Sequence, residues 1–194
     1  GSPMQLSNVR AVITGGVSGL GFATAQHLVK HGGKVALFDV NADKGAEAIA
    51  TLGADNASFF QTDVGDEEMV ATNVAAAKAA LGGLNVAINC AGILGAGRVL
   101  GKTGSMPLAQ FRTTVLVNLV GSFNVAKACA DLMQHNEVGD DGEVEAVLGP
   151  RQPAGRDDVR AARVAAHDRE GGGARLQLLR DPARGGARRQ PARL

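Results

Sequence analysis

The 194-residue sequence contains no tryptophan and no tyrosine, and it has only six phenylalanines and two cysteines. Two cysteines, Cys90 and Cys129, cannot form a disulfide framework, so we expect a reduced, cytoplasmic protein. No unbroken apolar run reaches the roughly 18 residues that span a bilayer, so we expect no membrane partner. The net charge of +1 favours no particular charged partner. The length suits one domain or slightly more.

Further residue types are missing from the last part of the chain. Residues 143–194 contain no Lys, Ser, Thr, Asn, Phe, Ile, Met or Cys, and 32 of these 52 residues are Arg, Ala, Gly or Pro. Their net charge is +4, whereas residues 1–142 have a net charge of −3. We therefore expect three parts: a tag scar at residues 1–3, an ordered domain over residues 4–143, and a biased tail over residues 144–194.

The ordered part alternates between two kinds of segment. Runs rich in β-branched residues predict strands at Val9–Thr14, Lys34–Val40, Ala57–Val64 and Leu84–Cys90. Helical patterns cover Gly19–His31, Ala42–Leu52, Asp66–Leu81 and Pro107–His135, the last with Pro107 in its first turn after a glycine-rich loop from Ala91 to about Met106. This alternation predicts an α/β fold: a Rossmann-type doubly wound parallel sheet with helices on both faces. A half-sheet in the order 3-2-1-4 would leave the far edge of the fourth strand unpaired.

A glycine-rich segment, TGGVSGLG, joins the first predicted strand to the first predicted helix. Its glycines include Gly15, Gly19 and Gly21. A dinucleotide site needs glycines here, because the turn is tight and the backbone approaches the pyrophosphate at the start of the helix. A plain glycine-rich turn is the alternative, although the position between strand and helix favours phosphate binding.

Asp39 ends the second predicted strand, 20 residues after Gly19. An acidic side chain at this spacing accepts hydrogen bonds from the adenosine ribose and repels a 2′-phosphate. The neighbouring Val17 and Val40 supply no positive charge, so the sequence favours NAD over NADP as the cofactor. The alternative role for Asp39 is that of a helix or turn cap.

With these residues, the chain resembles the short-chain dehydrogenase/reductase family over about residues 6–143. The segments TDV (Thr62–Val64), NCAG (Asn89–Gly92) and VNLVGSFNV (Val117–Val125) also resemble family motifs. The long loop before Pro107 and the segments ITGGVSGLG and NCAGI most resemble those of the type-2 3-hydroxyacyl-CoA dehydrogenases. The resemblance implies NAD-dependent oxidation of a secondary alcohol, such as a 3-hydroxyacyl-CoA in fatty acid metabolism or a hydroxysteroid-like alcohol. It also implies a homotetramer that uses the long helix.

The same resemblance implies roles for individual positions. At the cofactor it assigns Ser18 and Leu20 to the pyrophosphate, Asp39 to the ribose, Asp63 and Val64 to the adenine, and Cys90, Ala91 and Gly92 to the nicotinamide side. It makes Asn118 a member of the catalytic tetrad, where it binds a water in a proton relay. The alternatives are a small buried core residue for Cys90 and a helix-bending structural amide for Asn118.

The family continues with a catalytic Ser that orients the substrate oxygen and a Tyr that takes up the alcohol proton. A Lys four residues after the Tyr lowers the pKa of that Tyr. In this chain the resemblance fails at about Glu143–Val144, although EVEAVLG is compatible with a fifth strand. No tyrosine is present, and the last lysine is Lys127. The chain as written is therefore predicted to be inactive as a dehydrogenase. A non-catalytic dinucleotide-binding sensor is the alternative function.

Three hypotheses address the tail. It could be an Arg-rich nucleic-acid-binding arm, but its arginines alternate with seven acidic residues and it has no aromatic side chains to stack on bases. It could be a divergent folded half-domain, but it has few large apolar residues. We favour a frameshift, because a GC-rich coding region read out of frame yields excess Arg, Ala, Gly and Pro. We therefore expect no nucleic-acid partner.

The sequence contains two further clusters of candidate functional side chains. His27 and His31 lie four residues apart on a predicted helix, a spacing that can hold a metal, but no third ligand is apparent. The acidic residues Asp66, Glu67 and Glu68 are explained by the first turn of a helix, where the dipole favours negative charge. We predict no metal site.

Overall fold

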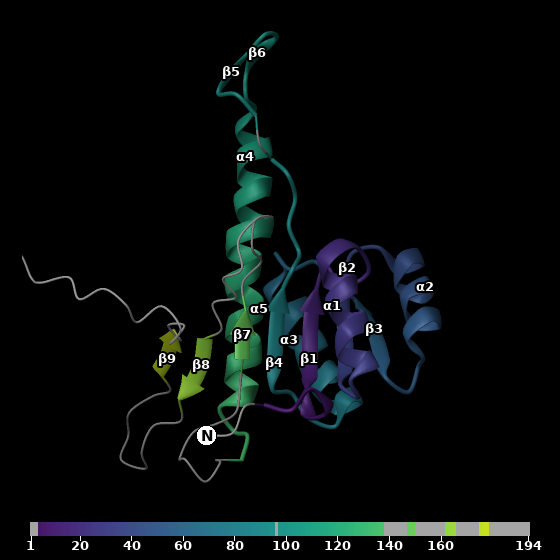
Figure 1. Ribbon diagram of the computed structural model, residues 1–194. Helices are drawn as coiled ribbons and strands as arrows, with labels where there is room; N and C mark the ends of the chain where they lie inside the picture. The colour runs from purple at the N-terminus through teal and green to yellow at the C-terminus, as the bar shows by residue number, and fades with distance from the viewer. Residues whose placement is uncertain (1–3, 96, 138–146, 150–161, 166–174, 179–194) are drawn as a thin grey trace, which may run out of the picture.

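The computed structural model describes residues 4–95, 97–137, 147–149, 162–165 and 175–178. A short 3₁₀ helix, η1 (Leu6–Asn8), precedes a seven-stranded sheet. The strands are β1 (Arg10–Thr14), β2 (Lys34–Asp39), β3 (Ala57–Gln61), β4 (Val86–Asn89), β7 (Val147–Gly149), β8 (Ala162–Ala165) and β9 (Arg175–Leu178). Their order is β3-β2-β1-β4-β7-β8-β9 (Figure 1). The first five in this order are parallel, which confirms the predicted parallel sheet, and β8 and β9 continue it antiparallel.

Helices cover both faces of the sheet, as predicted. Helices α1 (Gly19–Lys30) and α2 (Ala42–Leu52) pack on one face, and α3 (Glu67–Leu81) and α5 (Gly121–Met133) pack on the other. Neighbouring residues of β1 divide between the two cores: Ile13 joins the cluster of α1 and α2, whereas Val12 joins that of α3 and α5. Because successive side chains of a strand point to opposite faces, a buried apolar run needs a core on each side.

Two side chains fix the starts of α2 and α3. The Asn41 side chain accepts a hydrogen bond from the Lys44 N–H at 3.0 Å, as expected for a cap. The Asp66 side chain accepts one from the Met69 N–H at 2.9 Å, so Asp66 caps α3 and does not lie inside it as predicted. Because β1, β2 and β3 are parallel, these strand–helix turns lie at the same end of the sheet as the turn after β1.

The long helix predicted over 107–135 is present, with an internal change of type. It consists of α4 (Leu108–Val115), a π-helical segment η2 (Leu116–Val120), and α5. Pro107 precedes it with extended backbone at ψ 132°, so the predicted place of Pro107 in the first turn is wrong. The proline ring limits φ but allows either conformation, and here the chain arrives extended from the preceding hairpin.

The segment predicted as a glycine-rich loop contains a small antiparallel hairpin, which corrects that prediction. Its strands are β5 (Leu100–Gly101) and β6 (Gly104–Ser105). The hairpin lies at the outer end of α4, and together they project beyond the body formed by the sheet and α1 to α3 (Figure 1). Strands of two residues leave no alternating apolar pattern, which explains why the sequence did not reveal them.

The prediction that the far edge of the fourth strand is unpaired is wrong. Strand β7 pairs with β4 in parallel register, with Val86 opposite Val147 and Ile88 opposite Gly149. The apolar VLG stretch of the segment EVEAVLG supplies this strand. Apart from β7, β8 and β9, the tail from residue 144 lies outside the described residues, as does the proposed domain boundary at 143.

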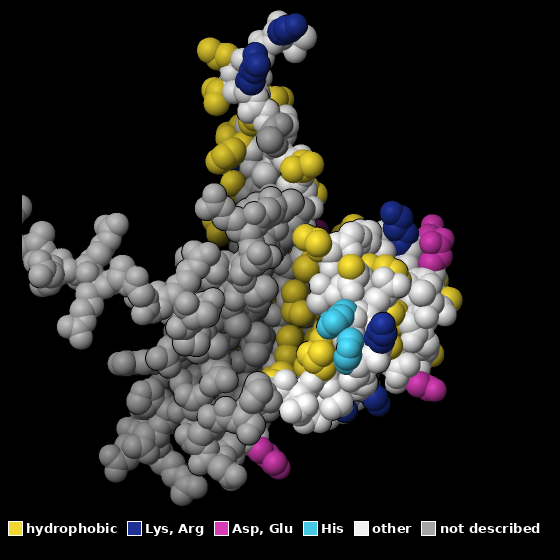
Figure 2. All heavy atoms as spheres, in the orientation of Figure 1, with side chains coloured by type: hydrophobic (Ala, Val, Ile, Leu, Met, Phe, Trp, Pro, Cys, Tyr) yellow, Lys and Arg dark blue, Asp and Glu magenta, His cyan; other side chains and the backbone are white. Residues whose placement is uncertain are grey.

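One helix in the described part of the chain corrects the expectation on apolar runs. The 26-residue segment Leu108–Met133 is long and apolar enough to cross a membrane by length and composition alone. The expectation concerned unbroken apolar runs, whereas this segment contains isolated polar residues. Figure 2 shows hydrophobic side chains along the projecting part of this helix and its hairpin. Leu108 and Phe111 of α4 are among the exposed large hydrophobic residues. Core helices of globular proteins satisfy the same criterion.

Candidate functional site

A cleft of about 350 Å³ opens where β1 to β4 end. All eleven residues predicted to bind a cofactor line it: Gly15, Ser18, Gly19, Leu20, Gly21, Asp39, Asp63, Val64, Cys90, Ala91 and Gly92. The lining also includes five that were not selected from the sequence: Phe38, Val40, Thr62, Ile93 and Val117. Strands β2 and β4 flank β1, so the cleft lies where the strand order reverses, the usual place for a ligand in an open α/β sheet.

The glycines after β1 allow backbone to pack directly against backbone. Gly15 has φ +60°, and a Cβ atom there would lie 2.9 Å from the Ala91 N and from the Cys90 carbonyl. A Cβ atom at Gly21 would collide with the Gly15 carbonyl. Gly19 has φ +53° but faces open space. Two of the three glycines are therefore required by close contact, and Gly19 by its backbone conformation.

The start of α1 faces the cleft. Ser18 occupies the cap position, and its side chain makes no capping hydrogen bond. The N–H groups of the first helical turn lack partners within the helix, and the helix dipole adds positive character there. This arrangement suits an anionic group such as a pyrophosphate.

Asp39 lies at the end of β2 on the rim of the cleft. Its Oδ1 accepts a hydrogen bond from the Asn41 N–H at 3.1 Å, so it supports the turn, but the cap of α2 is Asn41 itself. The part of the cleft wall that the structure describes contains no Lys or Arg. A carboxylate on a wall without positive charge is the electrostatic setting predicted for a ribose with free hydroxyl groups.

Thr62, Asp63 and Val64 form a further part of the cleft wall, after β3. The Asp63 Oδ1 accepts a hydrogen bond from the Gly65 N–H at 2.9 Å. The Thr62 hydroxyl donates to the Phe60 carbonyl and accepts from the Asn73 side chain at 2.8 Å. These side-chain contacts hold a short turn in one conformation against the cleft.

Thr14 supports the loop after β4, a role that sequence reasoning missed. Its Oγ1 accepts hydrogen bonds from the N–H groups of Cys90, at 3.1 Å, and Ala91, at 3.0 Å. The Thr14 side chain is fully buried, so water does not replace these bonds. In the sequence, only the place of Thr14 between a buried strand and Gly15 points to such a role. The hydrogen-bond partners lie 76 and 77 residues away, so the sequence does not identify them.

Asn118 lies beside the cleft, at the centre of η2, and does not line it. Its Oδ1 accepts from the Ile93 N–H, and its Nδ2 donates to the Ile93 carbonyl, both at 2.9 Å. The side chain thus pairs with one residue of the cleft wall as a neighbouring strand would. This pairing gives Asn118, inside a π-helical segment, a structural contact with the cleft wall. The predicted role in a catalytic proton relay stays a prediction.

Asn89 contributes a second amide at this end of the cleft. Its Nδ2 donates to the Ser122 carbonyl at 3.2 Å, which links the end of β4 to α5. Its Oδ1 is buried without a hydrogen-bond partner in the described part of the chain. Asn89 and Asn118 together attach the long helix to the loop that follows β4.

The two cysteines differ in environment. Cys90 is half-buried and lines the cleft, so it is not the core residue of the alternative interpretation. Cys129 is buried in the core, and this burial raises the pKa of its thiol to about 12.

The histidine pair on α1 lies outside the cleft. The rings of His27 and His31 are 4.4 Å apart, and the His31 Nδ1 lies 2.8 Å from the His27 carbonyl oxygen. In the ranges that the structure describes, no group of three or more His, Cys, Asp or Glu side chains could hold a metal ion. The pair is therefore explained by local contacts at the end of the helix.

Comparison with known proteins places these features in a family. Residues 9–147 match the family model described as short chain dehydrogenase. The chain is 42% identical over 135 residues to the human 3-hydroxyacyl-CoA dehydrogenase type-2, covering 69% of this chain and 51% of the relative. It is 38% identical over 141 residues to the enzyme of the same name from Drosophila melanogaster, covering 72% of this chain and 55% of the relative.

A solved structure gives the same result for the fold. The crystal structure of 3-hydroxyacyl-CoA dehydrogenase type-2 from Mycobacterium avium superimposes with a TM-score of 0.65 at 30% identity, over 73% of this chain and 55% of that chain. The chain thus spans about half the length of the relatives that it matches. The match of residues 9–147, which include every residue of the cleft, shows that the chain belongs to the short chain dehydrogenase family of oxidoreductases.

Proposed function

We propose that this chain is the NAD-binding part of an oxidoreductase that converts a secondary alcohol, such as a 3-hydroxyacyl-CoA, to the ketone. The observation that carries the proposal is the single cleft lined by all eleven predicted cofactor residues, at the switch point of the sheet. The names of the relatives support the 3-hydroxyacyl-CoA as substrate. A hydroxysteroid-like alcohol belongs to the same chemical class.

The residues of the cleft fit a dinucleotide. Gly15 and Gly21 let the loop after β1 pack directly against neighbouring backbone, and the start of α1, which lacks a side-chain cap, suits the pyrophosphate. Asp39 would hold the ribose hydroxyl groups, and its charge favours NAD over NADP. Asp63 and Val64 would flank the adenine, and Cys90 to Gly92 would line the nicotinamide side.

When bound, NAD would supply the hydride acceptor for oxidation of the alcohol. The chain's own contribution is to bind and orient it. Thr14 holds the backbone of the loop after β4 in place, and Asn118 holds Ile93, so the wall on the nicotinamide side is fixed in advance. A preformed wall lowers the cost of ordering the site on binding.

Proton removal from the alcohol is the step that this chain does not explain. The family uses a Tyr whose pKa a nearby Lys lowers, and the 194 residues contain no Tyr. We therefore propose that this chain binds NAD without turning over the alcohol. The alternative function, a non-catalytic dinucleotide-binding sensor, is favoured by the same absence of Tyr.

The direct test is a spectrophotometric assay for NADH formation from a 3-hydroxyacyl-CoA and NAD, combined with NADH binding to the same protein. We expect saturable NADH binding and no turnover. Absence of NADH binding would overturn the proposal. Turnover would show that other groups take the proton and would exclude the sensor alternative.

A homotetramer is the proposed assembly. The support comes from exposed apolar side chains along η2 and the adjoining helices. Phe111 is 56% exposed, Leu119 is 67% exposed and Phe123 is 67% exposed. An isolated chain would expose this surface to water, and contiguous exposed apolar surface commonly marks an interface.

A further inference from the structure

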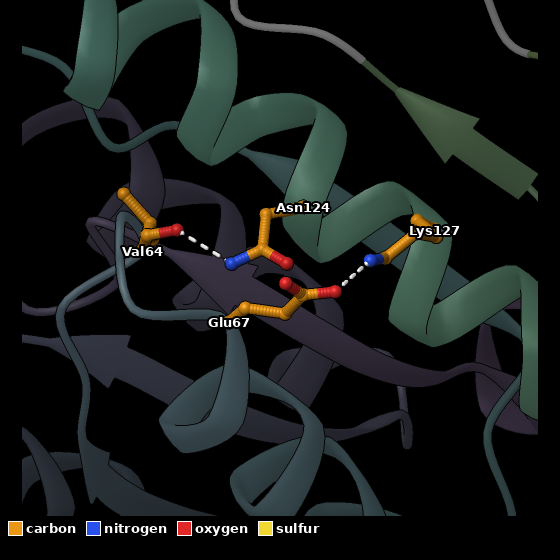
Figure 3. A network of polar contacts seen from close by, with 4 residues as sticks. All are labelled: Val64, Glu67, Asn124 and Lys127. Carbon is orange, nitrogen blue, oxygen red and sulfur yellow. Dashed lines mark hydrogen bonds and ion pairs between the residues drawn. The ribbon is translucent and has the colours of Figure 1, made fainter.

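A buried amide on α5 contacts the turn that forms one end of the cleft. Asn124 is 6% exposed, and its Nδ2 donates a hydrogen bond to the Val64 carbonyl at 2.9 Å (Figure 3). The two residues are 60 positions apart in the sequence. Because a buried amide donor requires a partner, this bond fixes the position of the Val64 carbonyl relative to the long helix.

The same peptide group is held at its other polar end. The Val64 carbonyl and the Gly65 N–H belong to one planar peptide unit. The carbonyl accepts from Asn124, and the N–H donates to the Asp63 Oδ1 at 2.9 Å. A rotation of this peptide that breaks the first bond also moves the N–H away from the second. The orientation of the Asp63 carboxylate is therefore linked to Asn124 through a single peptide unit.

Close packing supports this link. A Cβ atom at Gly121, one turn before Asn124, would collide with the Val64 side chain. A Cβ atom at Gly65 would lie 3.1 Å from the Leu116 side chain. The helix thus contacts the Val64–Gly65 pair through η2 and through α5. Because helix and turn are in direct contact here, a change at position 124 is passed on to the Val64–Gly65 peptide.

An ion pair lies one helical turn beyond this contact. The Lys127 Nζ contacts the Glu67 carboxylate at the start of α3 (Figure 3). Both side chains are well exposed, at 47% and 76%, so solvent screens the pair. It joins α5 to the start of α3, next to the turn that Asn124 contacts, without touching the cleft, which makes it a suitable control.

We propose that Asn124 is a positioning residue that orients the Asp63 carboxylate through the Val64–Gly65 peptide and so sets the affinity of the cleft for the adenine end of its ligand. This inference rests on the proposed NAD site. Asn124 does not line the cleft, whereas Asp63 and Val64 do. Replacing Asn124 should therefore weaken binding of the adenine end of the dinucleotide and leave binding of the nicotinamide end unchanged.

The test is a calorimetric titration of the whole chain with NADH, AMP and reduced nicotinamide mononucleotide. Asn124→Leu removes the donor at similar volume and is expected to weaken NADH and AMP binding by the same factor, about tenfold, which is roughly 1.4 kcal/mol. Binding of the nicotinamide mononucleotide should be unchanged. Lys127→Met should change none of the three affinities. Equal weakening of all three ligands, or of none, by Asn124→Leu would overturn the inference.

A double-mutant cycle tests the link to Asp63. Asp63→Ala removes the acceptor of the Gly65 N–H, so Asn124→Leu should weaken AMP binding much less in the Asp63→Ala background than in the wild type. Additive effects would contradict the inference. If circular dichroism shows that Asn124→Leu does not fold, Asn124→Ser is used in the same double-mutant cycle. This variant removes the amide with less change in polarity. If the wild type binds neither AMP nor NADH, the proposed function fails, and the inference fails with it.

Discussion

At the scale of single residues, the glycines of the loop after β1 have different reasons to be glycine. Gly19→Ala places a methyl group in open space, so its cost comes from the left-handed backbone alone, about 1 kcal/mol. Gly21→Ala drives a methyl group into the Gly15 carbonyl, and overpacking against backbone costs about 3 kcal/mol. Thermal unfolding followed by circular dichroism should show the larger loss of stability for Gly21→Ala. Equal losses would contradict the packing described for this loop.

The Glu67–Lys127 pair predicts a pH dependence of stability. The hydrogen bond and the positive charge of Lys127 lower the pKa of Glu67 below its ordinary value of 4.5. A carboxyl whose pKa is lower in the folded state stabilises the protein above the pKa of the unfolded state and loses this effect as the pH falls through the folded value. Glu67→Gln should therefore lower Tm slightly at neutral pH and leave it unchanged well below pH 4.5.

The control for this effect is Glu68→Gln, which removes the same charge from the same first turn of α3. High salt should reduce the Glu67 effect, because both partners are exposed. A Tm difference for Glu67→Gln that persists unchanged at low pH would contradict the assigned cause.

At the scale of elements, the sequence predicted the alternation of strands and helices because each has a strong period. It could not predict the π-helical turn at Leu116–Val120 or the β5–β6 hairpin. Neither segment is long enough to show the hydrophobic period by which helices and strands are recognised in a sequence. The supporting roles of Thr14 and Asn124 were missed for another reason: each bonds to a backbone group far along the chain, and residue type alone does not reveal such a partner.

The π-helical segment and the loop after β4 should behave as one unit. Asn118→Leu removes both hydrogen bonds to Ile93 and is expected to increase amide hydrogen exchange in residues 90–95. Asn118→Asp keeps the acceptor but loses the donor, so its exchange should be intermediate. Mass spectrometry of a peptide that covers this loop gives the measurement. Unchanged exchange in Asn118→Leu would show that the loop is held by other contacts.

At the scale of the whole molecule, fold and cleft follow from the same feature. A parallel sheet with crossover helices brings the strand ends together, so residues selected separately from Gly15 to Gly92 meet in one cleft. The pairing of β4 with β7 was not predicted, since the sequence gives strands but not their neighbours. The order of the first four strands was predicted correctly, because right-handed crossovers restrict the choices.

The composition of residues 144–194 leads to a prediction about the coding DNA. If this tail is read out of frame, another frame of the same DNA encodes a Tyr followed four residues later by a Lys. Sequencing the coding region and translating all frames is the measurement. A region in which no frame contains that pair would contradict the frameshift hypothesis and favour a genuine tail.

The proposed NAD site is tested most directly by the ratio of NADPH to NADH dissociation constants, measured by calorimetry. We expect the wild type to bind NADH at least about tenfold more tightly than NADPH, since Asp39 repels a 2′-phosphate and the described wall has no Lys or Arg. Asp39→Ala should bring the ratio close to one. Equal affinity for both nucleotides in the wild type, or no binding of either, would contradict the assignment of the cleft to NAD.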